Sequence, residues 1–274
     1  VTDLLAFFIE RPVLATVSAG LLLYTPALLD ILPIYIIFMV FSPIVMLHGM
    51  AQGWRVVIGL SVLLWIGAQF GLGPAIYRAV SSGFDVPLRY QDMGAFESLA
   101  WQLLWVVGLW MGATHSQPGR EPTRFPHWLV NAALVVAIAG FMWRHAVGQT
   151  PVPGGSPLND LFDKWHLGPL RLANFAALIV LAMHYAPWLK QHLPRWRFLE
   201  TLGKAALPVF CAHLVIALLA LALFGAARPE RPWSVDALIL FVGFYTLWLV
   251  ARVSIEVDRR AARRRARRTP EVLN

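Results

Sequence analysis

Two ionisable residues within apolar stretches are the strongest candidates for chemistry. His213 lies in the run LPVFCAHLVIALL, and Arg171 lies three residues before Asn174 in the run DKWHLGPLRLANF. Histidine is the side chain best suited to proton transfer near neutral pH, and the arginine fork matches carboxylate or phosphate oxygens. An imidazole can also bond a neighbouring helix's carbonyl, and an arginine near a membrane boundary can simply extend toward water. We predict catalytic roles for His213 and Arg171 and keep both alternatives open.

A second set of polar and aromatic residues suits the binding of a sugar or a carboxylate. These candidate binding residues are Asp163, Lys164, Asn174, Trp101, Gln102, Asp30 and Tyr35. Two of them have a simpler interpretation, because Trp101 can be a packing or interface residue and Asp30 can cap a helix. All lie near the ends of predicted membrane helices, where a polar ligand could reach them.

Several kinds of chemistry are excluded by the sequence. Cys211 is the single cysteine, so no internal disulfide and no metal site built on clustered cysteines can form. The sequence contains no phosphate-binding loop, no dinucleotide fingerprint, no HExxH and no GxSxG. We therefore predict no metal site and no bound cofactor.

The composition identifies the elements that must position these residues. Of 274 residues, 58% are hydrophobic and 14% charged, and the mean hydropathy is +0.61. Soluble domains carry about 25% charged residues, whereas membrane spans need runs of roughly 20 apolar residues. The sequence predicts an all-α, multi-pass membrane helix bundle with membrane lipids as partners. The basic character of the chain, with a pI near 10.2, therefore does not indicate a nucleic-acid partner.

Hydropathy predicts about seven membrane spans preceded by a short helix. The residues from Pro12 to Tyr24 form a semi-apolar stretch that we expect to be re-entrant or interfacial. The predicted spans cover 29–49, 54–74, 96–114, 127–146, 168–187, 204–224 and 235–256. Irregular outer segments are expected at 75–95 and 147–167.

The C-terminal tail sets the predicted orientation. Seven arginines lie in the last sixteen residues, and such clusters stay in the cytoplasm. We expect a membrane domain over 1–256 and a basic cytoplasmic tail over 257–274. Lys204 then marks a cytoplasmic helix end, and nine residues of rise put His213 roughly 14 Å into the membrane, near its midplane.

Four motifs, read together, resemble a known family. They are LDILPIY at 29–35, AWQLLWVVGLW at 100–110, DKWHLGPLRLANF at 163–175 and LPVFCAHL at 207–214. In this order and spacing they resemble the OpgC family of integral membrane proteins, which is similar to the acyltransferase-3 superfamily. The likeness extends from about Pro12 to Arg252. The chain departs from the family where Glu97 and Ser98 stand in place of Asn-Pro.

The resemblance implies a membrane O-acyltransferase of the bacterial inner membrane. An acyl-CoA donor, succinyl-CoA, would present its thioester from the cytoplasm, and the hydroxyl of a periplasmic glucan or other glycan would accept the acyl group outside. Family members have about ten spans, so we expect this chain to be N-terminally truncated and to lack the first of them. Rival hypotheses are a transporter or flippase for a sugar or lipid-linked glycan and a non-catalytic membrane subunit.

The same resemblance implies roles for the candidate residues. His213 would assist the base that accepts the hydroxyl proton, or would line the acyl path. Arg171 with Asn174 would hold the succinyl carboxylate or stabilise developing negative charge. The residues implied to position the sugar are Asp163, Trp101 and Gln102.

Overall fold

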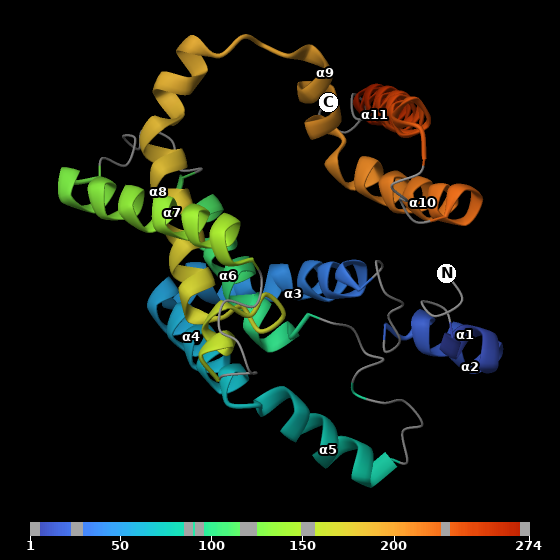
Figure 1. Cartoon of the computed structure of the whole chain (residues 1–274). Coiled ribbons are helices and arrows are strands. Elements are labelled where there is room, and N and C mark those ends of the chain that lie inside the picture. Colours follow the sequence, from blue (N-terminus) through green and yellow to red (C-terminus); the bar gives the residue numbers. More distant parts are fainter. Residues whose placement is uncertain are drawn as a thin grey trace. The chain divides into compact units, whose positions relative to one another are not determined.

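The computed structural model describes residues 6–22, 30–84, 90, 96–115, 125–148, 157–225 and 231–268 (Figure 1). Over these residues the chain is helical and contains no strand, which confirms the all-α class. The helices are α1 (Ala6–Glu10), α2 (Pro12–Gly20), α3 (Ile31–Gln52), α4 (Trp54–Gln69), α5 (Leu72–Phe84), α6 (Ser98–His115), α7 (His127–Val147), the 3-10 helix η3 (Pro157–Phe162), α8 (Pro169–His192), α9 (Arg197–Lys204), α10 (Ala206–Phe224) and α11 (Trp233–Arg268).

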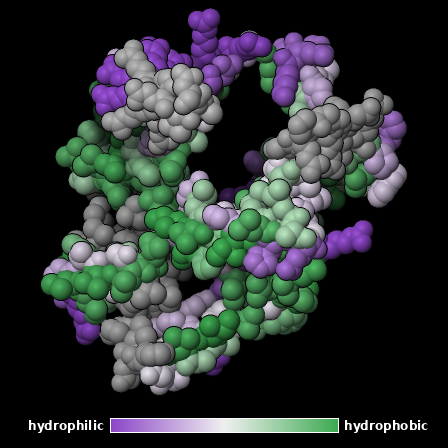
Figure 2. Space-filling view, turned by 180° about the vertical axis from the view of Figure 1, so that it is seen from behind, coloured by the Kyte–Doolittle hydropathy of each residue, from purple (hydrophilic) through white to green (hydrophobic). Residues whose placement is uncertain are grey.

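Five helices among the described residues are long and apolar enough to cross a membrane: α3, α7, α8, α10 and the Trp233–Arg264 part of α11. Their apolar side chains face outward, so that Leu47, Val135 and Leu223 are 69%, 67% and 75% exposed. Figure 2 shows hydrophobic residues over large parts of one face of the molecule. So much exposed apolar surface is unfavourable in water, whereas in a membrane the lipid chains cover it. The chain is therefore a multi-pass membrane protein.

The span predicted over 54–74 is not a single straight helix. The chain instead forms α4 and α5, which meet at a bend of 81° (Figure 1). Gly71 has a φ of +79°, a left-handed conformation that glycine adopts readily, and it breaks the helix at this point. Helix α5 also occupies part of the 75–95 segment that was expected to be irregular. The span predicted over 96–114 corresponds to α6, which is shorter than the other candidate spans.

The chain divides into two compact units, residues 2–192 and residues 193–274, which are described separately. In the first unit α4 packs against α6 and α3, and α7 packs against α8. Helix α2 has nine residues and rises only about 14 Å, too short to cross a hydrocarbon core of about 30 Å. It matches the short helix expected before the first span.

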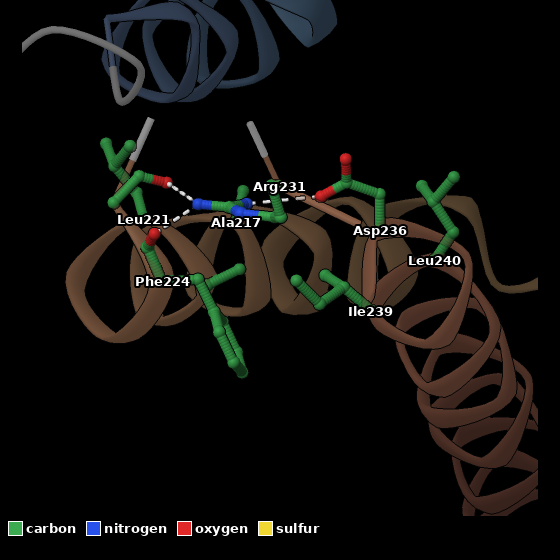
Figure 3. Close-up of a pocket in the computed structure, with 9 residues that line it drawn as sticks. Ala217, Leu221, Phe224, Arg231, Asp236, Ile239 and Leu240 are labelled. Atoms are coloured by element: carbon green, nitrogen blue, oxygen red, sulfur yellow. Dashed lines mark hydrogen bonds and ion pairs between the residues drawn. The ribbon is translucent and has the colours of Figure 1, made fainter. Parts of the chain in front are cut away.

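The second unit pairs α10 with α11, and Arg231 joins the end of α10 to the start of α11 (Figure 3). Its guanidinium donates to the Phe224 carbonyl, to the Gly225 carbonyl at 3.4 Å and to Asp236 Oδ1 at 3.2 Å. A cavity of about 320 Å³ lies beside this ion pair, between the two helices. Helix α11 continues without interruption from the predicted last span into the basic tail, as far as Arg268.

Candidate functional site

A tight turn over residues 163–168, which we call the 163–168 turn, joins η3 to α8. The Asp163 carboxylate accepts hydrogen bonds from the backbone N–H groups of Trp165 at 3.0 Å and His166 at 3.2 Å. The Asp163 carbonyl accepts a third bond, from the Gly168 N–H, at 2.8 Å. Aspartate is favoured in turns because its short side chain can bond the backbone two or three residues further on. Asp163 therefore organises the turn in which it lies.

Gly168 lets the turn pass close to the preceding 3-10 helix. A Cβ added there would clash with the Asp160 carbonyl oxygen at 2.4 Å, and a backbone oxygen cannot move aside as the end of a flexible side chain can. The turn can therefore close only with glycine at this position. Its closure brings the start of α8 directly against the end of η3.

The main chain of the 163–168 turn is tied to α4 and α6. The carbonyls of residues 165, 166 and 167 accept hydrogen bonds, in that order, from Trp101 Nε1 at 3.0 Å, Gln69 Nε2 at 2.6 Å and Trp65 Nε1 at 3.0 Å. Satisfying three consecutive carbonyls holds the backbone in one conformation. The turn is thus held in place by two helices, α4 and α6.

Asp163 and His166 form a carboxylate–imidazole pair. His166 Nδ1 lies 2.5 Å from Asp163 Oδ2. Burial opposes ionisation of Asp163, but the hydrogen bonds from the His166 ring and from two backbone N–H groups outweigh it, so the pKa of Asp163 lies below its usual range. An ionised carboxylate only accepts, so we assign the shared proton to Nδ1, which leaves Nε2 unprotonated in the neutral form of the ring. Nε2 is then an acceptor, on a side chain that is 46% exposed.

Aromatic rings and a cation surround this pair. The Lys164 ammonium lies 3.8 Å from the centre of the Trp165 ring, a cation–π contact. The Phe96 ring meets Trp101 and Trp165 edge to face, with centroids 5.0 and 5.1 Å apart. The predicted binding residues Trp101, Lys164 and Asp163 are therefore brought together at this turn.

A buried carboxylate, Glu97, lies at the start of α6 beside the turn. The Tyr90 hydroxyl donates to Glu97 Oε2, and the Glu97 backbone N–H donates to the Trp165 carbonyl at 3.0 Å. Burial, this hydrogen bond and the nearby negative charge raise the pKa of Tyr90 well above its usual value. Tyr90 therefore stays protonated and keeps its bond to Glu97 across the working pH range.

Gln102 is buried and bonded to α4 and to its own helix, α6. Its side-chain oxygen accepts from Ser61 Oγ at 2.7 Å, and its amide nitrogen donates to the carbonyls of Ser61 at 2.8 Å and Leu99 at 3.1 Å. These bonds join α6 to α4. Contact of Gln102 with a sugar stays a prediction, since these bonds occupy both ends of the amide.

Arg171 and Asn174 lie on α8 but face different neighbours. Arg171 Nε donates to the Phe162 carbonyl at 3.1 Å, so the guanidinium lies over the end of η3 while its side chain remains exposed. Asn174 lies against α7, where a Cβ added at Gly140 would be 2.7 Å from Asn174 Oδ1. Within the described residues this buried oxygen has no hydrogen-bond partner. Arg171 thus borders the turn, and Asn174 lies between α7 and α8.

The remaining predicted residues are not joined to the turn by any hydrogen bond that the structure describes. His213 is the eighth of nineteen residues in α10, in the second unit; it is exposed, and its ring has no hydrogen bond within the described parts of the chain. Asp30 directly precedes α3 and is buried, but its side chain makes no capping bond, so its interpretation as a helix cap is wrong. Tyr35 is exposed on α3.

Sequence reasoning missed the polar face of α4. Ser61, Trp65 and Gln69 are spaced four residues apart, which places all three on one side of a helix. That spacing inside an apolar segment is a signal that could have identified them. In the described part of the chain, no three potential metal ligands of the His, Cys, Asp or Glu type come together.

Comparison with known proteins identifies the family. Residues 2–259, nearly the whole chain, match the family described as OpgC protein. No curated protein and no solved structure matches the chain. The family match covers all four motifs and the 163–168 turn. The chain therefore belongs to the OpgC protein family.

Proposed function

We propose that this protein is an O-acyltransferase of the bacterial inner membrane. It moves a succinyl group from succinyl-CoA to a hydroxyl of a periplasmic glucan. Family membership supports the reaction class. The observation that carries the proposal is the Asp163–His166 pair, held at 2.5 Å on a turn that α4 and α6 fix in place. A hydroxyl nucleophile needs such a base, because an alcohol is scarcely ionised at neutral pH.

In the proposed reaction, His166 Nε2 accepts the proton of the glucan hydroxyl as its oxygen attacks the thioester carbonyl carbon. The carbonyl π electrons move onto oxygen, giving a tetrahedral oxyanion. When that oxyanion collapses, the C=O bond re-forms, the C–S bond breaks and the departing sulfur takes the proton back from the protonated His166 imidazole, so the products are an ester, free CoA and the original His166. Asp163 keeps the imidazole in the required tautomer and stabilises its protonated form, as in other His–Asp pairs.

The other candidate residues have proposed supporting roles. Arg171 holds the succinyl carboxylate or the oxyanion with its terminal guanidinium nitrogens, since Nε is already bonded to the Phe162 carbonyl. Lys164 and Trp101 contact the sugar beside the pair. His213 lines the path by which the thioester end of succinyl-CoA reaches the outer side of the membrane. Its place near the middle of α10 supports this role.

The test is direct detection of the ester. The full-length protein is reconstituted in liposomes with isotopically labelled succinyl-CoA and a β-glucan oligosaccharide, and the glucan is analysed by mass spectrometry. We expect labelled succinyl ester with the protein and none with empty liposomes. The His213→Ala variant should form little ester at unchanged protein level in the membrane. Absence of ester with the intact protein would refute the proposal, and normal ester formation by His213→Ala would remove His213 from it.

A further inference from the structure

A basic cleft of about 540 Å³ lies between α9 and α11 in the second unit. Its polar lining residues are Thr201, Lys204, Arg252, Glu256, Arg259 and Arg260. Four cations therefore share one concavity with a single carboxylate. Clefts of about 300–1,000 Å³ are the size at which proteins bind small molecules.

Most of this positive charge is not neutralised by the protein. Glu256 Oε1 is paired with Arg260 Nε at 3.0 Å, one helical turn away. Lys204, Arg252 and Arg259 are exposed and have no ion-pair partner within the described residues. Like charges gathered in one cleft repel one another, and an anion bound among them would relieve that repulsion.

The charged residues of the cleft occupy regular positions on two helices and are not scattered over the surface. Arg252, Glu256 and Arg259 recur at intervals of four and three residues, which places them on one face of α11. Lys204 reaches the cleft from the last turn of a different helix, α9. The Arg252 guanidinium lies 5.2 Å from the centre of the Trp248 ring, and this contact restricts the conformations of the arginine side chain in the unliganded protein.

We propose that this cleft binds phosphate groups, and that they are those of the acyl-CoA donor. The inference rests on the proposed function and extends it by assigning the residues that hold the donor. Arginine offers the paired donors that phosphate oxygens accept, and CoA carries a terminal 3′-phosphate together with a pyrophosphate. Lys204 and the end of α11 lie on the predicted cytoplasmic side, where acyl-CoA is found. Anionic lipid headgroups carry the same phosphate chemistry and are the competing source.

The first experiment measures binding without catalysis. The full chain is placed in phosphatidylcholine nanodiscs, and CoA and 3′-dephospho-CoA are titrated calorimetrically. We expect Arg252→Gln and Arg259→Gln to weaken CoA binding about tenfold each, because each loses charge-assisted bonds to phosphate. The matched control is Arg264→Gln, which removes a charge from the same helix outside the cleft lining. It should bind CoA as the wild type does.

A second experiment separates the two sources of phosphate. Spin-labelled phosphatidylglycerol is added to the same nanodiscs, and its bound fraction is compared among the variants. A selective effect of the cleft variants on CoA affinity supports the donor site. A selective effect on phosphatidylglycerol alone identifies the lipid as the source and overturns the donor assignment. The donor assignment is also overturned if the protein does not bind CoA, or if the cleft variants bind CoA as tightly as Arg264→Gln does.

These outcomes are distinguishable from failure of the proposed function. CoA binding at the cleft without any ester formation would refute acyl transfer and leave the phosphate site standing. If the protein forms ester but its cleft variants bind CoA normally, acyl transfer would stand and the phosphate site would be refuted.

Discussion

Replacing Gln102 by leucine tests whether the α4–α6 pair depends on its buried amide. The substitution keeps a side chain of similar size but removes hydrogen bonds to Ser61 Oγ, the Ser61 carbonyl and the Leu99 carbonyl. Interhelical hydrogen bonds in membrane proteins contribute on average about 0.6 kcal/mol and up to about 1.7. Two of the three bonds join α6 to α4 and the third, to Leu99, lies within α6, so their loss should lower the free energy of unfolding by about 2 kcal/mol. Ser61→Ala removes only one of them and should cost about 0.5–1 kcal/mol.

The assay is reversible unfolding by SDS in mixed micelles, followed by tryptophan fluorescence. The matched control is Gln52→Leu, because the side chain of Gln52 is exposed and makes no hydrogen bond in the described structure. Its unfolding free energy should stay within about 0.5 kcal/mol of the wild type. Equal stability of Gln102→Leu and Gln52→Leu would refute the structural role of Gln102. If acyl transfer then fell in Gln102→Leu, the sugar contact predicted from sequence would account for it.

Three further predictions concern the turn and the topology. Arg171→Lys loses the planar fork, so acyl transfer should fall roughly ten- to a hundredfold at level expression, as in Arg171→Ala; near-normal transfer in the lysine variant would make Arg171 an interfacial anchor. Because the folded pKa of Asp163 is lowered, its carboxylate stabilises the fold above the ordinary value of 3.8 and loses this effect as the pH falls through the lowered pKa. The stability difference between the wild type and Asp163→Asn should therefore be larger at pH 7 than at pH 3, and an equal difference would contradict the account. Cysteine at Ser156, with Cys211 replaced by serine, should be labelled by an impermeant thiol reagent in intact cells; protection until lysis would refute the predicted outer position of 147–167.

The membrane fold was largely predictable because its main determinants are local. A run of apolar residues of sufficient length must form a helix in lipid, whatever surrounds it. Five predicted spans accordingly appear as long apolar helices. The bend within 54–74 was not predicted, because hydropathy stays high through Gly71 while the backbone turns there. A window average does not register one residue with a positive φ.

Some members of the site were predictable, but His166, Trp65 and Gln69 were not among them, and neither were the contacts of the site. Asp163, Arg171 and Trp101 were recognisable as polar or aromatic groups near apolar helix ends. Their partners include main-chain carbonyls, which every residue carries and which leave no signature in a sequence. The bond from Trp65 to the Leu167 carbonyl joins residues 102 positions apart, beyond the reach of any local pattern.

The pH dependence of acyl transfer by His166→Gln and Asp163→Asn, compared with the wild type, tests the central claim most directly. The control is His145→Gln, because among the described residues the His145 ring bonds only the Phe141 carbonyl of its own helix, 2.9 Å away. Loss of a general base costs about 10²–10⁴-fold, so His166→Gln should fall at least about a hundredfold while CoA binding and protein level are kept. Asp163→Asn should also fall, because an amide no longer holds the imidazole in the required tautomer. His145→Gln should match the wild type at every pH. Wild-type rates with an unchanged pH profile in His166→Gln would contradict the assignment of the Asp163–His166 pair as the base.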